Sequence, residues 1–240
     1  MATLFLSDLH LPDEPSPLRE GFLHFLRGPA CTASAVYILG DLFEYWIGDD
    51  VGLSAYAAEV SALRALTAQG VPVYFQHGNR DFLVGARFAQ ATGVTLLADP
   101  QRIELDGVPT LLGHGDLWCT DDHGYQRWRR FSRNRLAQWL FMRLPESRRE
   151  AIAGGVRGQS HSDKRMKAES IMDVNAQAIA QAFRTQKVQR ILHGHTHRPD
   201  AHRLTVDGRE VERWVLADWH PDRMEYLEAT DGTLRRCRLT

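Results

Sequence analysis

Apolar runs that alternate with helical patterns constrain the fold of this chain more than any other feature of its sequence. Each apolar run has the short length and polar boundaries of a buried strand. The segments between the runs have the spacing of amphipathic helices. The predicted strands are 3–6, 35–39 and 71–75, and the predicted helices are 18–26, 53–69 and 84–92. This alternation predicts an α/β fold that begins with parallel strands.

Antiparallel pairing is predicted in the second half of the chain. Asp106-Gly107, Asp207-Gly208 and Asp231-Gly232 each lie between strand-like runs. Asp-Gly favours a tight type I′ hairpin because both turn residues need a positive φ. The expected fold class is therefore α/β, with mixed strands in two sheets that pack face to face.

Five short polar motifs recur along the chain, the first three at the ends of predicted strands. They are Asp8-Leu9-His10, Gly40-Asp41, Gly78-Asn79-Arg80-Asp81, Gly113-His114-Gly115-Asp116 and Gly194-His195-Thr196-His197. The steps from Asp8 to Asp41, to Asn79 and to His114 are 33, 38 and 35 residues, each about one strand–helix–strand unit. Because loops at the carboxyl ends of strands converge on one edge of an open α/β sheet, we expect the motifs to form one site.

The residue types of these motifs suit two divalent metal ions. Carboxylate oxygen and imidazole nitrogen are ligands for Mn, Fe, Zn or Co, and no thiolate is present in the motifs. A central aspartate such as Asp41 can bridge two ions about 3.5–4 Å apart. His195 and His197, two positions apart, can reach different ions from one loop. His77 and His193 are expected to have structural roles. Each motif alone is a weak signal, but the five together indicate a dinuclear site.

A basic segment at residues 124–167 interrupts this pattern. It carries 12 Lys or Arg and 3 Asp or Glu, whereas the whole chain has a net charge of −1. Its apolar residues have approximate helical spacing, and they are Tyr125, Trp128, Phe131, Leu136, Trp139 and Leu140. Two interpretations are open. A helical pair packs this stripe on the core and exposes a solvated basic face, or the segment meets an anionic, partly apolar ligand or membrane surface.

The sequence favours a cytoplasmic location. The first residues lack the basic region of a signal peptide, and no apolar run approaches the roughly 20 residues needed to span a bilayer. Cys31, Cys119 and Cys237 form no CxxC pair, so neither a disulfide framework nor a thiolate zinc site is expected. Any membrane contact is expected to be peripheral.

The five motifs together resemble those of the calcineurin-like metallophosphoesterases. Longer segments narrow the resemblance to the UDP-2,3-diacylglucosamine diphosphatase family of lipid A synthesis, over essentially the whole chain. These segments are 7–11, 37–44, 46–50, 77–83, 119–122, 165–167, 171–174 and 193–199. The resemblance implies a four-layered αββα sandwich of two mixed sheets. It also implies that residues 1–240 form a single domain with a helical cap at about 124–170.

The resemblance further implies a dinuclear centre in which Asp41 bridges two ions. The first ligand set would be Asp8, His10, Asp41 and His197, and the second would be Asp41, Asn79, His114 and His195. The family uses manganese, so two Mn²⁺ ions are the expected cofactor.

Arg80 departs from the wider superfamily, in which a histidine at this position helps to protonate the leaving oxygen. Arginine cannot donate that proton at neutral pH, and a phosphate leaving group does not need it. The family cleaves UDP-2,3-diacylglucosamine into UMP and 2,3-diacylglucosamine 1-phosphate at the inner face of the cytoplasmic membrane. The implied catalytic residues are Arg80 and His195, and the implied substrate contacts are Asn79, Arg80, Asp122, Ser160, Lys164, Lys167 and His195. Position 164 is an asparagine in some members of the family.

Three other functions are weighed against this one. A metallophosphoesterase could act on another nucleotide diphosphate or phosphodiester, although a small substrate has no need of an apolar groove. A catalytically inactive scaffold would be expected to have lost ligand residues. A nuclease is disfavoured by the acidic balance outside residues 124–167, so no nucleic-acid partner is expected. The sequence indicates no obligatory protein partner.

Overall fold

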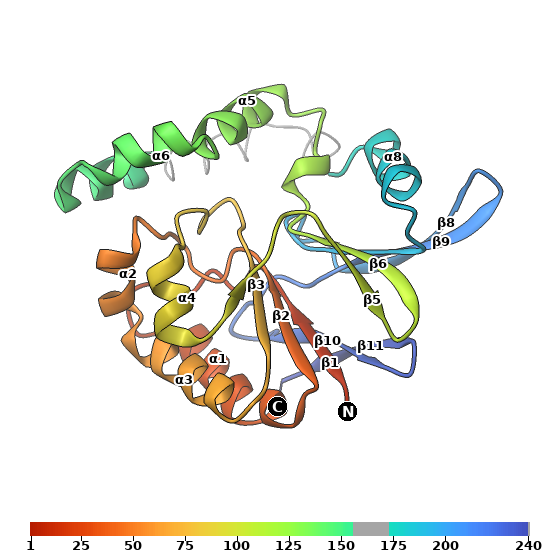
Figure 1. Cartoon of the computed structure of the whole chain (residues 1–240), viewed down its shortest axis with the longest axis horizontal. Coiled ribbons are helices and arrows are strands. Elements are labelled where there is room, and N and C mark those ends of the chain that lie inside the picture. Colours follow the sequence, from red (N-terminus) through yellow and green to blue (C-terminus); the bar gives the residue numbers. More distant parts are fainter. Residues whose placement is uncertain (156–172, 240) are drawn as a thin grey trace.

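Two mixed β-sheets form the centre of the fold (Figure 1). The computed structural model of the chain describes residues 1–155 and 173–239. The first sheet has six strands in the order β11-β10-β1-β2-β3-β4. Its strands are β1 (Thr3–Leu6), β2 (Ala35–Leu39), β3 (Val73–Gln76), β4 (Thr95–Leu96), β10 (Glu225–Thr230) and β11 (Thr233–Arg238). The strands β1 to β4 run parallel, and β10 pairs antiparallel with β1.

The second sheet has five strands in the order β5-β6-β7-β9-β8. They are β5 (Gln101–Leu105), β6 (Val108–Gly113), β7 (Arg190–His193), β8 (Asp200–Val206) and β9 (Arg209–Val215). The central strands β6, β7 and β9 run parallel, and β5 and β8 pair antiparallel at the two edges. Both sheets are therefore mixed, as the sequence predicts.

Apolar side chains fill the space between the two sheets. Phe5 and Leu39 of the first sheet form one buried cluster with Leu112 and Leu192 of the second. These four residues are fully buried. The contact fixes the two sheets face to face, so that loops at their ends lie close together.

Helices cover the outer face of each sheet. On the first sheet lie α1 (Pro17–Arg27), α3 (Ala57–Ala68) and α4 (Ala86–Thr92), with the short α2 (Asp49–Ala55) beside them and a 3₁₀ turn at Pro29–Thr32. On the second sheet, α8 (Ala176–Gln186) packs Ile179 and Phe183 against Leu111 and Ile191. The expected helix–sheet–sheet–helix layering is confirmed (Figure 1).

The three Asp-Gly turns have the conformation that their sequence predicts. Asp106, Asp207 and Asp231 each have a φ of 50°, and the glycines that follow them have φ values of 76–78°. Each turn connects two antiparallel strands. Paired positive φ values are the mark of the type I′ hairpin.

The predicted helix at 53–69 is wrong as a single element, because Tyr56 divides it into α2 and α3. Tyr56 has φ −113° and ψ 36°, which is not helical. Its buried hydroxyl donates to the carbonyl oxygen of Leu11 at 2.9 Å, and its ring packs on Phe43. A tertiary anchor thus breaks the helix where the local sequence contains no stop signal.

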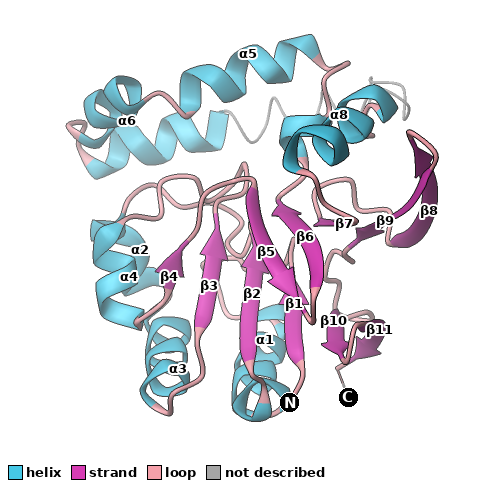
Figure 2. Ribbon diagram, turned by 45° about the vertical axis from the view of Figure 1, so that its right-hand side comes forward, coloured by secondary structure: helices cyan, strands magenta, loops and turns pink. Residues whose placement is uncertain are grey.

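A layer of helices lies over the loop end of the sandwich (Figures 1 and 2). It comprises α5 (His123–Ser132), α6 (Arg135–Met142) and helical residues 146–155, which together we call the cap. Phe131, Leu136, Trp139 and Leu140 are 51–64% exposed. The interpretation in which the whole stripe packs on the core is therefore wrong, although its first residue, Tyr125, does point inward and contacts Asp116 and His195. Among the described helices, none has the length and apolar content that crossing a membrane requires.

Candidate metal centre

The predicted ligand residues lie in loops that follow five strands. Asp8 follows β1, Asp41 follows β2, Asn79 follows β3, His114 follows β6, and His195 and His197 follow β7. The side chains of His10 and His197 meet although the residues are 187 positions apart. The motifs meet in one site, as expected. The spacing argument placed them at the edge of a single sheet, however, whereas His114, His195 and His197 follow strands of the second sheet.

The backbone at this site adopts the left-handed conformation at several residues that carry side chains, which is uncommon outside glycine. Five site residues have φ values between 48° and 68°, and they are Asp8, His10, Asp41, His195 and His197. A non-glycine residue in this region costs roughly 1–3 kcal/mol and persists only where the surrounding structure enforces it. Such outliers gather at functional sites, and five of them occur here within a single cluster of side chains.

Two glycines let the loops approach each other closely. A Cβ atom on Gly78 would collide with the carboxylate and backbone nitrogen of Asp41, and one on Gly194 would collide with Ser7 and Asp8. The buried carboxylate of Asp81 then fixes the Gly78 loop, because it accepts hydrogen bonds from Gly78 N and from Leu42 N, both at 2.8 Å.

The first ligand set is assembled around Asp8. His197 Nε2 lies 3.4 Å from Asp8 Oδ1, and His10 Nε2 lies 4.0 Å from the same oxygen. The two histidine Nε2 atoms are 3.4 Å apart. One potential ligand atom from each of Asp8, His10 and His197 lies within 4.8 Å of the others, a spacing that one metal ion can span.

The second ligand set is assembled around His114. Its Nε2 lies 3.0 Å from Asn79 Oδ1 and 3.7 Å from Asp41 Oδ2, and its ring centre is 5.0 Å from that of His195. The same Asp41 Oδ2 lies 4.0 Å from His10 Nε2 of the first set. One carboxylate oxygen thus faces both groups of ligands, which is the position that a bridging ligand needs.

The electrostatics of the site suit cations. Burial and the neighbouring carboxylates of Asp81 and Asp8 raise the pKa of Asp41 to about 7, despite the opposing charge of His114. Burial alone would lower the pKa of His114, but the carboxylates of Asp41 and Asp8 raise it to about 9. Within the described residues, neither Asp8 nor Asp41 pairs with a lysine or arginine side chain. Divalent ions would neutralise these buried carboxylates, so the residues fit a metal centre.

The far ring nitrogens of three histidines face oxygen atoms. His114 Nδ1 lies 2.9 Å from the carbonyl oxygen of Leu39, His197 Nδ1 lies 3.4 Å from Asp218 Oδ2, and His10 Nδ1 lies 3.4 Å from Glu44 Oε2. Metal-binding histidines generally use their second nitrogen in this way, which orients the ring. Our sequence analysis did not identify Asp218 or Glu44. The only signal for Asp218 is its place just after β9, at the same edge as the ligands.

Arg80 lies between the second ligand set and Glu44. Its backbone N–H donates to Asp41 Oδ1 at 2.7 Å, and its Nη1 lies 3.6 Å from Glu44 Oε1. Its side chain is 12% exposed. A guanidinium held here can form two hydrogen bonds with an anionic phosphate group.

The structure describes some of the remaining residues that the sequence analysis singled out, but not all of them. Asp122 caps α5 by accepting a hydrogen bond from Tyr125 N at 3.0 Å. His77 hydrogen-bonds to the carbonyl oxygen of Val84, and the buried His193 hydrogen-bonds to that of Gly194, so both have structural contacts. Ser160, Lys164 and Lys167 lie outside the described residues.

Part of the positive charge of the basic segment is used inside the protein. Arg129 binds Asp99 and Asp116, and Arg133 donates to two backbone carbonyl groups. Arg149 is 3% exposed and donates to the carbonyl oxygen of Ile47 and to Asp50. These three arginines are therefore anchors of the cap and are engaged without a ligand.

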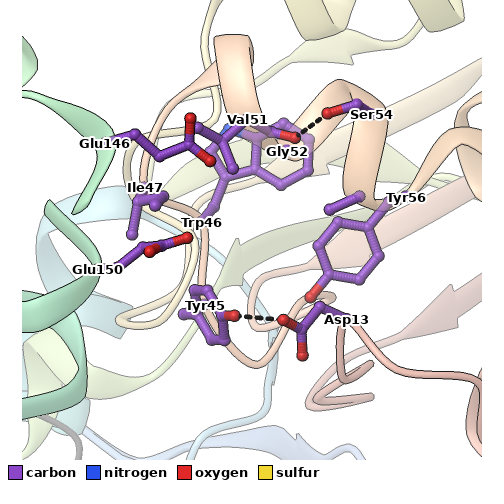
Figure 3. Close-up of a pocket in the computed structure, with 11 residues that line it drawn as sticks. Asp13, Tyr45, Trp46, Ile47, Val51, Gly52, Ser54, Tyr56, Glu146 and Glu150 are labelled. Carbon is purple, nitrogen blue, oxygen red and sulfur yellow. Dashed lines mark hydrogen bonds between the residues drawn. The ribbon is translucent and has the colours of Figure 1, made fainter.

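A pocket of about 370 Å³ lies between α2 and the third helical segment of the cap (Figure 3). Trp46, Tyr45 and Asp13 line one side, and Glu146 and Glu150 line the other. The pocket includes no predicted metal ligand. Its carboxylates make it a poor place for a phosphate group.

Similarity to known proteins agrees with this geometry. Residues 1–199 match the calcineurin-like phosphoesterase family. The UDP-2,3-diacylglucosamine hydrolase of Aeromonas hydrophila is 48% identical over 219 residues, or 91% of each chain. That of Proteus mirabilis is 45% identical over 231 residues, or 96% of each chain. That of Edwardsiella ictaluri is 51% identical over 221 residues, 92% of this chain and 85% of the relative. The chain belongs to the calcineurin-like phosphoesterase family, in the branch that contains the UDP-2,3-diacylglucosamine hydrolases.

Proposed function

We propose that this protein hydrolyses the pyrophosphate bond of UDP-2,3-diacylglucosamine. The products are UMP and 2,3-diacylglucosamine 1-phosphate, in a step of lipid A synthesis. The observation that carries the proposal is the position of Asp41 Oδ2, which faces His10 and His114 at 4.0 and 3.7 Å. The names of the relatives, which are 45–51% identical to the chain, support the choice of substrate.

The proposed cofactor is a pair of divalent ions. The resemblance to the diphosphatase family suggests that both ions are Mn²⁺. The first ligand set would hold one ion, the second set would hold the other, and Asp41 would bridge them. Bound there, the ions supply an activated water as nucleophile and neutralise charge on the phosphoryl group. The chain's own contribution is to hold Asn79 and the histidines around Asp41 before substrate arrives.

Arg80 and His195 are the proposed catalytic residues. Arg80 would bind the diphosphate through its guanidinium and stabilise the charge that develops on the phosphoryl oxygens. Burial, together with the charge of His114, lowers the pKa of His195 to about 3. His195 is therefore neutral at pH 7 and can serve as a metal ligand that also faces the phosphoryl oxygens. The attack at the α-phosphorus releases the lipid 1-phosphate as an anion, so no residue needs to protonate it.

The remaining substrate contacts are proposed from the resemblance. They are Asn79, Asp122, Ser160, Lys164 and Lys167. We further propose that residues 1–240 form one domain with an insertion at about 124–170, to which the cap belongs.

The exposed apolar side chains of the cap support a location at the cytoplasmic face of the inner membrane. Trp139 and Leu140 are 51% and 54% exposed, and Arg143 lies 4.2 Å from the Trp139 ring centre. Aromatic and basic side chains on one helix favour the interface of an anionic membrane. We propose a peripheral contact, and the lipid substrate would reach the site from that surface.

A product assay tests the proposed reaction. The purified protein is incubated with Mn²⁺ and UDP-2,3-diacylglucosamine, with a parallel sample in chelator. We expect UMP and the lipid 1-phosphate, with both products lost on chelation and in Asp41→Ala. If the protein binds two ions but forms no UMP, the choice of substrate is wrong, and other nucleotide diphosphates and small phosphodiesters become the candidates.

A further inference from the structure

Two arginines at the C-terminal end of α5 reach down from the cap to the metal-site loops. Arg129 lies in the last turn of α5, and Arg133, four residues later, is the residue that caps its C-terminus, so the two side chains lie on the same side of the helix end. Their side chains are 14% and 21% exposed. Each ends on a segment that carries a predicted ligand of the second set.

Arg129 holds the segment of His114. Its Nη2 donates to Asp99 Oδ2 at 3.0 Å, and its Nε donates to Asp116 Oδ2 at 2.9 Å. Asp99 Oδ1 in turn accepts the backbone N–H of His114 at 3.1 Å. Asp116 lies two positions after His114 and is fully buried. The guanidinium therefore neutralises two carboxylates that flank one metal ligand.

Arg133 holds the segment of Asn79. Its Nη2 donates to the carbonyl oxygens of His77 and Gly78 at 3.2 and 2.9 Å. Gly78 directly precedes Asn79, whose Oδ1 lies 3.0 Å from His114 Nε2. The two arginines thus fix both partners of this contact from the end of one helix.

A third contact joins α5 to the same group. The hydroxyl of Tyr125 donates to Asp116 Oδ2 at 2.6 Å, and its ring centre lies 5.8 Å from that of His195. Meanwhile the outer side chain of Phe131 is 61% exposed. The described inner contacts of α5 are thus largely polar and converge on the second ligand set.

We propose that Arg129 and Arg133 are positioning residues that couple the seating of the cap to the binding of the second metal ion. This inference rests on the dinuclear site of the proposed function. Seating of α5 holds His114 and Asn79 in place for the ion. By thermodynamic reciprocity, occupancy of the second set stabilises the seated cap by the same free energy.

The test compares Arg129→Gln and Arg133→Gln with the matched control Arg130→Gln. Arg130 lies on α5, is exposed, and donates to the carbonyl oxygen of Gln126 one turn earlier in the same helix. Titration calorimetry and electron paramagnetic resonance of Mn²⁺ give the number of bound ions, their affinities and the signal of a coupled pair. Amide hydrogen exchange of α5, with and without Mn²⁺, reports the seating of the cap.

We expect the second ion to bind roughly 10–100-fold more weakly in both test variants, as for other residues that orient metal ligands. The first ion should keep its affinity. Mn²⁺ should slow exchange in α5 of the wild type and of Arg130→Gln, and this protection should be lost in the test variants. If both test variants bind two ions with wild-type affinity, or if Mn²⁺ leaves α5 exchange unchanged in the wild type, the inference is wrong.

Arg129→Gln leaves two buried carboxylates without their partner and can fail to fold. Arg133→Gln removes two donors to carbonyl groups and a longer ion pair of 3.9 Å with Asp116, which keeps Arg129 and Tyr125 as closer partners. It therefore decides the question if Arg129→Gln is unfolded by circular dichroism. A wild-type protein that binds fewer than two ions would overturn the proposed metal site itself. If the wild type binds two ions and the test variants bind them equally well, only the coupling proposed here is wrong.

Discussion

His10 and His197 point their Nε2 atoms at each other across a distance of 3.4 Å. One ring is supplied by the loop after β1 and the other by the loop after β7, so the contact joins the two sheets. The opposite nitrogen of His197 faces Asp218, which is itself held by His220 at 2.7 Å and by Arg223 at 2.6 Å. The orientation of His197 therefore depends on a carboxylate that has fixed partners.

Asp218→Asn should weaken binding of the first ion by roughly 10–100-fold, because the amide loses the charge that orients His197 and increases its basicity. Affinity for Mn²⁺ is measured by calorimetry, and activity is then assayed at saturating Mn²⁺. We expect excess metal to restore most of the activity. Wild-type affinity in Asp218→Asn would show that this carboxylate does not orient the ligand.

Asp41→Asn should reduce kcat by about 10³-fold, since a bound metal contributes several kcal/mol to transition-state stabilisation. The variant should hold at most one Mn²⁺, because the shared oxygen loses its charge. Asp207→Asn is the matched control. Asp207 has a φ of 50°, close to the 53° of Asp41, but it lies in an exposed hairpin turn. Equal losses in the two variants would mean that strain, and not metal binding, is responsible.

Arg80→Ala should lower kcat/KM by roughly 10²–10³-fold while both ions remain bound. The backbone N–H of residue 80 still donates to Asp41 Oδ1, so the ligand set keeps its geometry. Arg80→Lys should recover part of the loss, because lysine keeps the charge but not the paired donors. Turnover that is unchanged in Arg80→Ala, with full metal content, would remove this residue from the mechanism.

The metal-free protein should lose stability as the pH rises from about 6.5 to 9. The pKa of His114 is raised from 6.5 to about 9 in the native state, so the native state binds more protons than the unfolded state in this range. The free energy of unfolding then falls with rising pH, by about 1–3 kcal/mol for one such group. Asp41, whose pKa is raised from 3.8 to about 7, contributes in the same direction up to pH 7.

Urea unfolding in chelator at pH 6.5, 7.5 and 9 measures this decline. In His114→Gln the decline should be smaller, because the titrating group is absent. Saturating Mn²⁺ should oppose the decline, since the ion binds the deprotonated ligand. A metal-free stability that is constant or rises over this range would contradict the assignment.

The double variant Trp139→Glu/Leu140→Glu should bind anionic vesicles roughly tenfold or more weakly than the wild type. Burial of a large apolar side chain contributes about 1.5–3 kcal/mol, and 1.4 kcal/mol is a factor of ten. Vesicle sedimentation measures binding, with Ala58→Glu on the exposed surface of α3 as the control. Equal binding by all three proteins would place the membrane contact elsewhere or exclude it.

The fold and the ligand loops could be predicted because their signals are local. The Asp-Gly turns need positive φ at both residues, and the apolar strands end directly before their polar motifs. By contrast, the break at Tyr56 depends on a hydrogen bond to Leu11, a residue 45 positions away. No local pattern contains that information.

The roles of Asp218 and Arg129 could not be predicted for a related reason. Asp218 acts through its distance from His197, which only the folded sheets define. Arg129 reaches carboxylates 30 and 13 positions earlier in the chain. A basic helix has the same sequence pattern whether its arginines face water or buried acids, so charge alone did not distinguish anchors from ligand-binding residues.

Two of the cap's anchors are ion pairs with acidic residues of the body, namely Arg129 with Asp99 and Asp116, and Arg149 with Asp50. The cap is therefore difficult to exchange on its own for the insertion of a related enzyme. A graft that replaced the cap with the insertion of another phosphoesterase would leave acidic acceptors in the body without their cations. A working chimera would have to carry its own acceptors below the new helices. We therefore expect the cap, which faces the substrate, and the loops that hold the metal ligands to change together during evolution.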